Sequence, residues 1–349
     1  MNAQYFDITQ TKEGWHSAFA FQVFHRPAED WAKMRWGFNA AALLDEALDR
    51  CKLFLEAQSI NESLFFDKEQ PIRSLALRGI NFPGRGVQMA ILGKVTTSSQ
   101  QVEKAGSNYA RQIFSIFPQD FILQPARTQS EYDSLAGIEM LSRQPQVASI
   151  QRQSVLIPPM RHQQEIPGLW RATARSNEQI WRALSNMPQM VMLNILMQPA
   201  FLFEKEKERL LEIQRTVLDA EKRPDTLLPY YSWLESYIKR RLTPWKKFFL
   251  IQIHALFENT RDNDYLHAIG SAITRDADDH SLPGFEIINP ASEAETTEWL
   301  ENIHSLTISN QQDLDNIADL EEAFAVFRFP FRPEAGLPGA NFIEPSGTG

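Results

Sequence analysis

The amino-acid sequence predicts an α+β fold, in which helices pack on antiparallel sheets. Segments whose apolar residues alternate, as in half-buried strands, are interspersed with segments of helical spacing. The same order of segments then recurs in both halves of the 349 residues. With 43% hydrophobic and 23% charged residues, the composition is that of a soluble globular protein long enough for two domains.

The first half, residues 1–140, is predicted to form one lobe. Its expected elements, in order, are a strand at 17–23, a helix from 28 to about 58, strands at 72–78 and 86–95, a helix that ends at 116 and a strand at 120–124. The strands at 72–78 and 86–95 are joined by turn-forming residues and indicate a hairpin. This order is typical of the split βαβ, or ferredoxin-like, arrangement, in which two helices cover one face of a four-stranded antiparallel sheet.

A weakly patterned stretch, residues 141–168, separates the halves and is interpreted as a linker or bridging strand, with strand spacing at 147–157. Residues 169–310 repeat the order with a helical hairpin inserted at about 200–242. The expected elements of this second lobe are strands at 170–174, 189–198, 249–257 and 285–288, and helices at 176–187, 264–273 and 293–303. The sequence therefore predicts two ferredoxin-like lobes.

The last segment, residues 311–349, contains a helix that gives way to a Pro- and Gly-rich connector. Leu320, Phe324 and Phe327 form an apolar stripe, and Pro330 and Pro333 forbid further helix because each lacks an N–H. The run EEAFAVFRFPFRPEAGLPG resembles the connector that leads from the N-terminal region into the motor domain of FtsK/HerA superfamily ATPases. The second half, with LWRATARSNEQIWRAL and FFLIQIHALFENTRDNDYLHAIGSAI among its segments, is similar to the region before that motor.

This resemblance implies a non-catalytic region of an ATP-driven DNA or protein translocase. In the family, such regions mediate assembly of the motor ring, contact protein partners of the same system and present DNA or protein substrates. Type IV secretion and phage-defence systems both use relatives. The resemblance implies a homo-oligomer, and it places ATP and magnesium only in a motor domain beyond this chain.

No catalytic signature is found in the sequence. The nearest approach to a phosphate-binding loop has six residues between Gly86 and Gly93, where four are required, and Val95 where Ser or Thr should hold magnesium. Those six residues have the pattern of a strand. The acidic run around Asp276 and His280 lacks the glycine and glutamate of a calcium loop and is interpreted as a solvated turn. We therefore expect neither a cofactor nor a metal in this chain.

Location is indicated by two features. Cys51 is alone and cannot form an internal disulfide, which fits the reducing cytoplasm. The most apolar run, residues 190–203, is interrupted by polar residues and proline and is too short to span a bilayer. Direct membrane insertion is not expected.

One basic cluster is a candidate nucleic-acid site, although the net charge of −9 argues against a protein that coats nucleic acid with its whole surface. Its residues are Lys239, Arg240, Arg241, Trp245, Lys246 and Lys247. The cations can contact phosphates while the indole stacks on a base. Alternatively, they cap a helix C-terminus and solubilise a strand edge. The second functional hypothesis is therefore a stand-alone cytoplasmic scaffold or nucleic-acid-binding subunit of a multiprotein complex.

Overall fold

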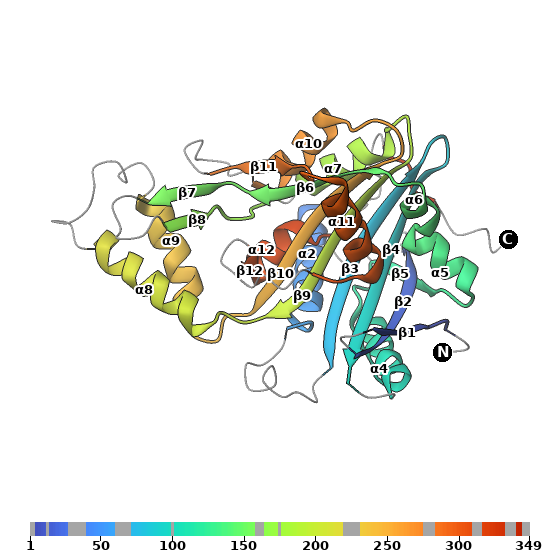
Figure 1. Cartoon of the computed structure of the whole chain (residues 1–349), viewed down its shortest axis with the longest axis horizontal. Coiled ribbons are helices and arrows are strands. Elements are labelled where there is room, and N and C mark those ends of the chain that lie inside the picture. The colour runs from blue at the N-terminus through green and yellow to red at the C-terminus, as the bar shows by residue number, and fades with distance from the viewer. Residues whose placement is uncertain are drawn as a thin grey trace.

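The α+β class is confirmed by a computed structural model of the chain (Figure 1). The structure describes residues 4–11, 14–26, 40–59, 71–98, 101–157, 164–173, 176–218, 231–274, 283–308, 316–331 and 340–343. Within these residues, ten strands form one antiparallel sheet and two more form a separate hairpin. The predicted aspartate-rich turn around Asp276 lies outside the described residues.

The large sheet contains β1 (Asp7–Thr11), β2 (Gly14–His25), β3 (Ile72–Phe82), β4 (Gly86–Thr97), β5 (Phe121–Pro125), β6 (Gln146–Arg152), β9 (Val191–Ala200), β10 (Phe248–Phe257), β11 (Phe285–Ile288) and β12 (Ile317–Asp319). The hairpin is β7 (Ser154–Ile157) with β8 (Gln164–Pro167). The helices are α2 (Ala40–Glu56), α4 (Val102–Ile116), α5 (Gln129–Ala136), α6 (Ile138–Ser142), α7 (Ser176–Ser185), α8 (Glu204–Leu218), α9 (Tyr231–Leu242), α10 (Asn263–Thr274), α11 (Glu293–Ser305) and α12 (Leu320–Val326).

The strand order of the sheet is β1-β2-β4-β3-β9-β10-β6-β11, with β5 on the β1 side of β2 and β12 on the β6 side of β10. The first half thus contributes β5-β2-β4-β3 and the second contributes β9-β10-β6-β11. The halves meet where β3 pairs with β9, from Leu75 with Met197 to Asn81 with Val191. One sheet therefore runs without a break through both halves.

The first strand of the second half differs from the prediction. Residues 170–174 were expected to form it, but Arg171 makes only an isolated bridge to Thr274. The backbone N–H of Trp170 donates to the carboxylate of Glu322 (3.2 Å) and not to a neighbouring strand. The position next to β10 is occupied by β6, which lies in the stretch interpreted as a linker or bridging strand.

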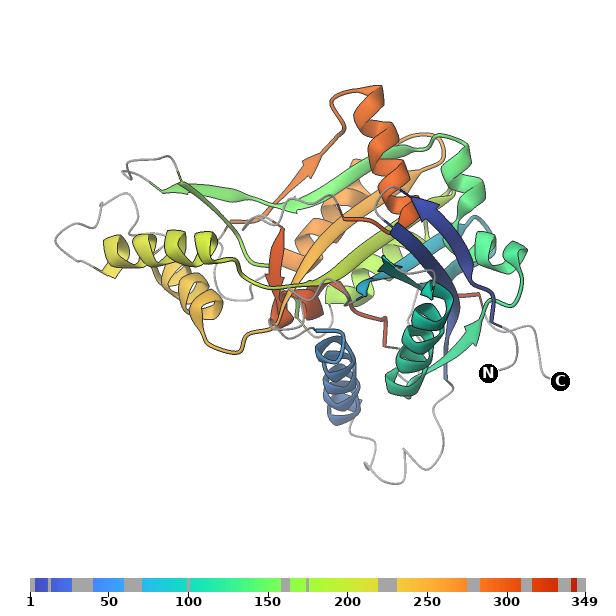
Figure 2. The same ribbon diagram turned by 60° about the horizontal axis from the view of Figure 1, so that its bottom comes forward.

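Both faces of the sheet are buried, by different sets of helices. One face packs against α2, α4, α7, α10 and α12 through residues such as Phe54, Ile113 and Trp181. The other face is covered by α5, α8 and α9 in one apolar cluster and by α6 and α11 in a second, smaller one. The helical hairpin α8–α9 lies with the β7–β8 hairpin at one end of the molecule (Figure 1, Figure 2). On α8, the buried Leu210 and Ile213 share one apolar cluster with residues of α9. The described part of the hairpin thus packs within the chain.

A buried arginine fixes the junction of the halves. Arg78 of β3 donates to the side-chain oxygen of Asn194 on β9 from two nitrogens, at 2.9 and 2.8 Å. It also donates to the carbonyls of Ala136 at the end of α5 and Ile303 near the end of α11 (2.8 Å). Because helix C-termini carry partial negative charge, one guanidinium stabilises two helix ends and the β3–β9 pairing. Complete burial lowers the pKa of Arg78 to about 10.

Two further predictions can be compared with the fold. Residues Gly86–Val95 lie in strand β4, as their apolar run predicted. The exit helix is also confirmed as α12, although residues 332–339 of the connector lie outside the described part. Beyond them, Phe342 makes a parallel bridge with Val87, and its ring lies 4.8 Å from that of His25. No described helix is long and apolar enough to cross a bilayer.

Candidate functional site

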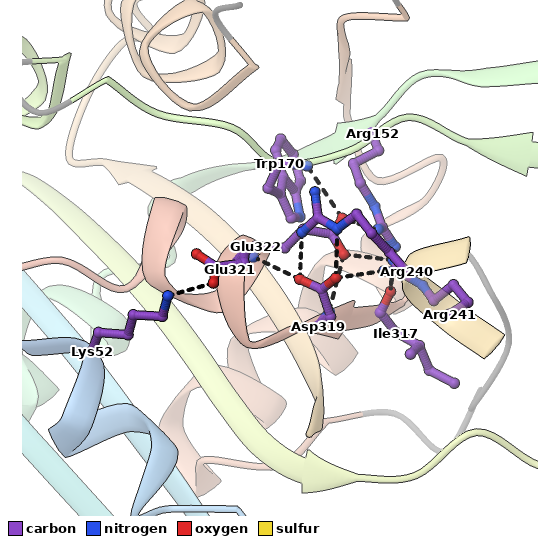
Figure 3. A network of polar contacts seen from close by, with 9 residues as sticks. All are labelled: Lys52, Arg152, Trp170, Arg240, Arg241, Ile317, Asp319, Glu321 and Glu322. Carbon is purple, nitrogen blue, oxygen red and sulfur yellow. Dashed lines mark hydrogen bonds and ion pairs between the residues drawn. The ribbon is translucent and has the colours of Figure 1, made fainter. Parts of the chain in front are cut away.

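Two of the predicted cluster residues, Arg240 and Arg241, belong to an internal charge network (Figure 3). Both lie in the last turn of α9, and the Arg241 side chain is fully buried. Arg240 is 24% exposed and donates to both carboxylate oxygens of Asp319, at 2.7 and 2.6 Å. A bidentate pair of this geometry is among the stronger charged hydrogen bonds. These arginines are therefore engaged in ion pairs within the chain.

The acidic half of the network is the start of α12. Asp319 accepts a hydrogen bond from the backbone N–H of Glu322 (3.1 Å), and Glu322 accepts one from that of Asp319 (3.0 Å). This capping box satisfies two helix-end donors and fixes both carboxylates. Local sequence therefore places the two acids side by side, where distant arginines reach them.

Glu322 is the centre of the network. One of its oxygens accepts from Arg152 of β6 (2.8 Å), and the other from Arg241 of α9 (2.5 Å). Arg152 and Arg241 also donate to the carbonyl of Ile317, at 3.0 and 3.1 Å. The side chains of Glu322 and Arg241 are fully buried, and that of Arg152 is 1% exposed. One carboxylate thus ties α12 to a strand and to a second helix.

The electrostatics keep Asp319 and Arg241 charged. Burial opposes ionisation of Asp319, but the hydrogen bond from Arg240 and the charges of both arginines outweigh it and hold the pKa of Asp319 below its ordinary value. Burial likewise opposes the charge of Arg241, yet Glu322 and Asp319 raise its pKa. A buried charge is tolerated when it is paired and hydrogen-bonded, and these are.

The rest of the predicted cluster lies on the surface. Lys239 is exposed, Lys246 and Lys247 are partly exposed, and Trp245 is 96% exposed. Trp245 sits in the turn between α9 and β10 with a φ of 63°, a region uncommon for residues other than glycine. The indole is held out into solvent, followed in the same connection by Lys246 and Lys247, while Lys239 lies in the last turn of α9.

Several network residues were missed by sequence reasoning. The spacing of Asp319 and Glu322 is that of a capping box, so their pairing had a local signal. Arg152 had none, because its partner Glu322 lies 170 residues away.

His254 was also missed. It is 5% exposed, and burial lowers its pKa to about 4.

Comparison of the sequence with models of known families gives no match, and comparison with curated proteins gives none either.

Proposed function

We propose that this chain is the non-catalytic, assembly and partner-binding N-terminal region of a FtsK/HerA-like ATP-driven DNA or protein translocase. The observation that supports it is the anchoring of the segment that resembles the family's pre-motor connector. Asp319 and Glu322, at the start of that segment, are held by three arginines from β6 and α9. On the exposed side of the same helix, α12, Glu321 pairs with Lys52 of α2. A domain that follows α12 would be attached to the sheet through a helix that ion pairs hold in place.

The proposed architecture of this region is two ferredoxin-like units joined edge to edge. In each half the order of strands fits the split βαβ pattern, with β2 as the first strand of one unit and β6 as that of the other. The two helices that such a unit needs are α2 and α4 in the first half, and α7 and α10 in the second. All four pack on the same face of the sheet. ATP and magnesium belong, on this proposal, to the motor domain, and the region serves the motor's homo-oligomer and its protein partners in a secretion or phage-defence system.

The coding sequence downstream of Gly349 tests the translocase proposal. We expect an in-frame glycine-rich loop that ends in Lys-Ser or Lys-Thr, within a few tens of codons. A stop codon at that position would exclude the pre-motor role and leave a stand-alone protein.

The second candidate function is a scaffold or nucleic-acid-binding subunit, and one observation favours it. Trp245 projects almost completely into solvent, directly before Lys246 and Lys247 in the sequence and six residues after Lys239. An exposed indole among cations can stack on a base while the lysines neutralise phosphates.

Replacing these three lysines with serine tests nucleic-acid binding without disturbing the network, because Arg240 and Arg241 are left in place. If the lysines contact phosphates, the affinity for single-stranded DNA falls and the slope of log K against log salt is reduced by about 2. Fluorescence anisotropy at several salt concentrations measures both. The control replaces the exposed Lys104, Lys205 and Arg111 with serine and should leave the slope unchanged. Equal affinity of the lysine variant and the original protein would contradict DNA binding at this surface.

A further inference from the structure

Two strands pair with the same edge of β10 at different positions, and a cleft lies between them. On one side of β10, β12 pairs with Phe248–Leu250 and β6 pairs with His254–Phe257. Between these two partners, β6 leaves β10 and pairs with β11 instead (Figure 1). A cavity of about 280 Å³ lies at the opening, lined by backbone and side chains of both strands. Helix α11 covers it.

One side chain in this cleft has unused hydrogen-bonding capacity. His254 of β10 is 5% exposed, and its Nδ1 is buried without a partner. Such a group costs free energy unless something binds it. Its ring lies 5.5 Å from that of Trp299, tilted by 58°. Burial holds the pKa of His254 at about 4, so the ring is neutral near pH 7, with a hydrogen on one nitrogen and a lone pair on the other.

The remaining lining is rich in hydrogen-bond acceptors and carries negative charge. The polar lining residues are Ser149, Gln151, Gln252, Asn302 and Asn316, with Glu295 and Glu298 contributed by α11. One oxygen of Glu295 accepts from the backbone N–H of Ala291. Among the described residues that line the cleft, Arg152 is the cation, and its charge is matched by Glu322. A phosphate or carboxylate ligand is therefore disfavoured.

Two indoles complete the lining. Trp299 and Trp170 border the cavity from different elements, and an indole face attracts a cation through its quadrupole. The volume is just below the range of about 300–1,000 Å³ typical of pockets for drug-sized ligands, so the occupant is small. Acceptors, acids and indoles together match one chemistry, a compact organic cation with several N–H donors.

We propose that this cleft binds a guanidinium or primary ammonium group carried on a short aliphatic chain, with Glu298 as its counter-ion and Trp299 as its aromatic contact. The group is supplied either by a free small molecule or by an arginine side chain of a protein partner. This inference does not depend on the proposed translocase function.

Isothermal titration calorimetry on the whole chain at low salt tests the proposal, with agmatine as the free cation and an acetylated, amidated Gly-Arg-Gly peptide as the side-chain source. At least one of the two binds, and the tighter one identifies the source. Glu298→Gln weakens the binding about tenfold, as expected for loss of a hydrogen bond to a charged group. Glu298 is exposed, so this change leaves the fold intact.

The matched control is Glu301→Gln, on the same helix and equally exposed, which lines a different groove. It removes the same charge and keeps the original affinity. Trp299→Leu weakens binding as well, and the bound cation alters tryptophan fluorescence in the original protein. Absence of heat with both probes, or equal affinity in the Glu298 and Glu301 variants, would overturn the proposal.

Discussion

Replacing Glu322 with glutamine is expected to lower the free energy of unfolding by about 3–5 kcal/mol. The amide keeps the size of the side chain but removes the charge that compensates Arg152 and Arg241, whose side chains are 1% and 0% exposed. Arg241 then has Asp319 as its carboxylate partner, 3.4 Å away, and Asp319 already pairs with Arg240. Breaking one side of a buried ion pair is costly because the remaining charge stays out of water. Urea denaturation followed by tryptophan fluorescence measures the loss.

The neighbouring residue supplies the control. Glu321 pairs with Lys52, but the two side chains are 49% and 35% exposed. Surface pairs contribute about 0–1 kcal/mol, so Glu321→Gln should shift stability by no more than that. Both substitutions remove one negative charge, so the difference between their effects on stability measures the contribution of burial (Figure 3). A similar, small effect of both variants would mean that Glu322 is hydrated and that α12 is not anchored by the network.

The local spacing of apolar residues and prolines predicted most helices and strands, because it depends only on neighbouring residues. The residues of β10 alternate between two apolar clusters, with Phe249 and Ile251 in one and Leu250 in the other, and the strand was expected close to its observed bounds. The exit helix was predicted for a similar reason, since Pro330 prevents its continuation. Such features can be predicted without knowing which distant residues they contact.

The pairing of the halves had no comparable signal. Strands β3 and β9 are mostly apolar and are buried on both faces, as in a central strand, but this pattern does not say which neighbour each strand takes. Residues that pair across this junction, such as Ala76 and Leu196, are far apart in the sequence. The order of elements predicted two lobes, but it gave no signal that their strands pair into one sheet. A strand was predicted in the region of β6, but its position next to β10 was missed because the Gln- and Pro-rich surroundings suggested a linker or bridging strand.

The basic cluster shows the same limit at the level of a site. Five cations in nine residues predicted a patch, and nothing nearby indicated that Arg240 would reach Asp319, 79 residues away. Charge density along a sequence records the number of cations but not their partners. Only the surface lysines and Trp245 retain the predicted environment.

A pH dependence of stability is expected from His254. Its pKa in the folded protein, about 4, is below the ordinary value of 6.5 because burial disfavours the cation. Above pH 6.5 both folded and unfolded chains hold the neutral ring, and its protonation has no effect. As the pH falls from 6.5 to 4, the unfolded chain takes up the proton first, so stability decreases. The gap between the two values corresponds to about 3 kcal/mol.

His254→Leu isolates this contribution, since leucine fills the site without titrating. Between pH 6.5 and 4, the variant should lose about 3 kcal/mol less of its unfolding free energy than the original protein, measured by urea denaturation at each pH. The charged groups that share the cleft, Glu295, Glu298 and Arg152, are present in both proteins, so the comparison isolates the contribution of His254. The same substitution at the exposed His304 serves as control, because its ring is in contact with water in the folded chain. Parallel pH profiles for the original protein and the His254 variant would show that the ring is solvated. The cleft beside β10 would then be open to water at this position, because burial is what keeps the ring of His254 neutral below its ordinary pKa.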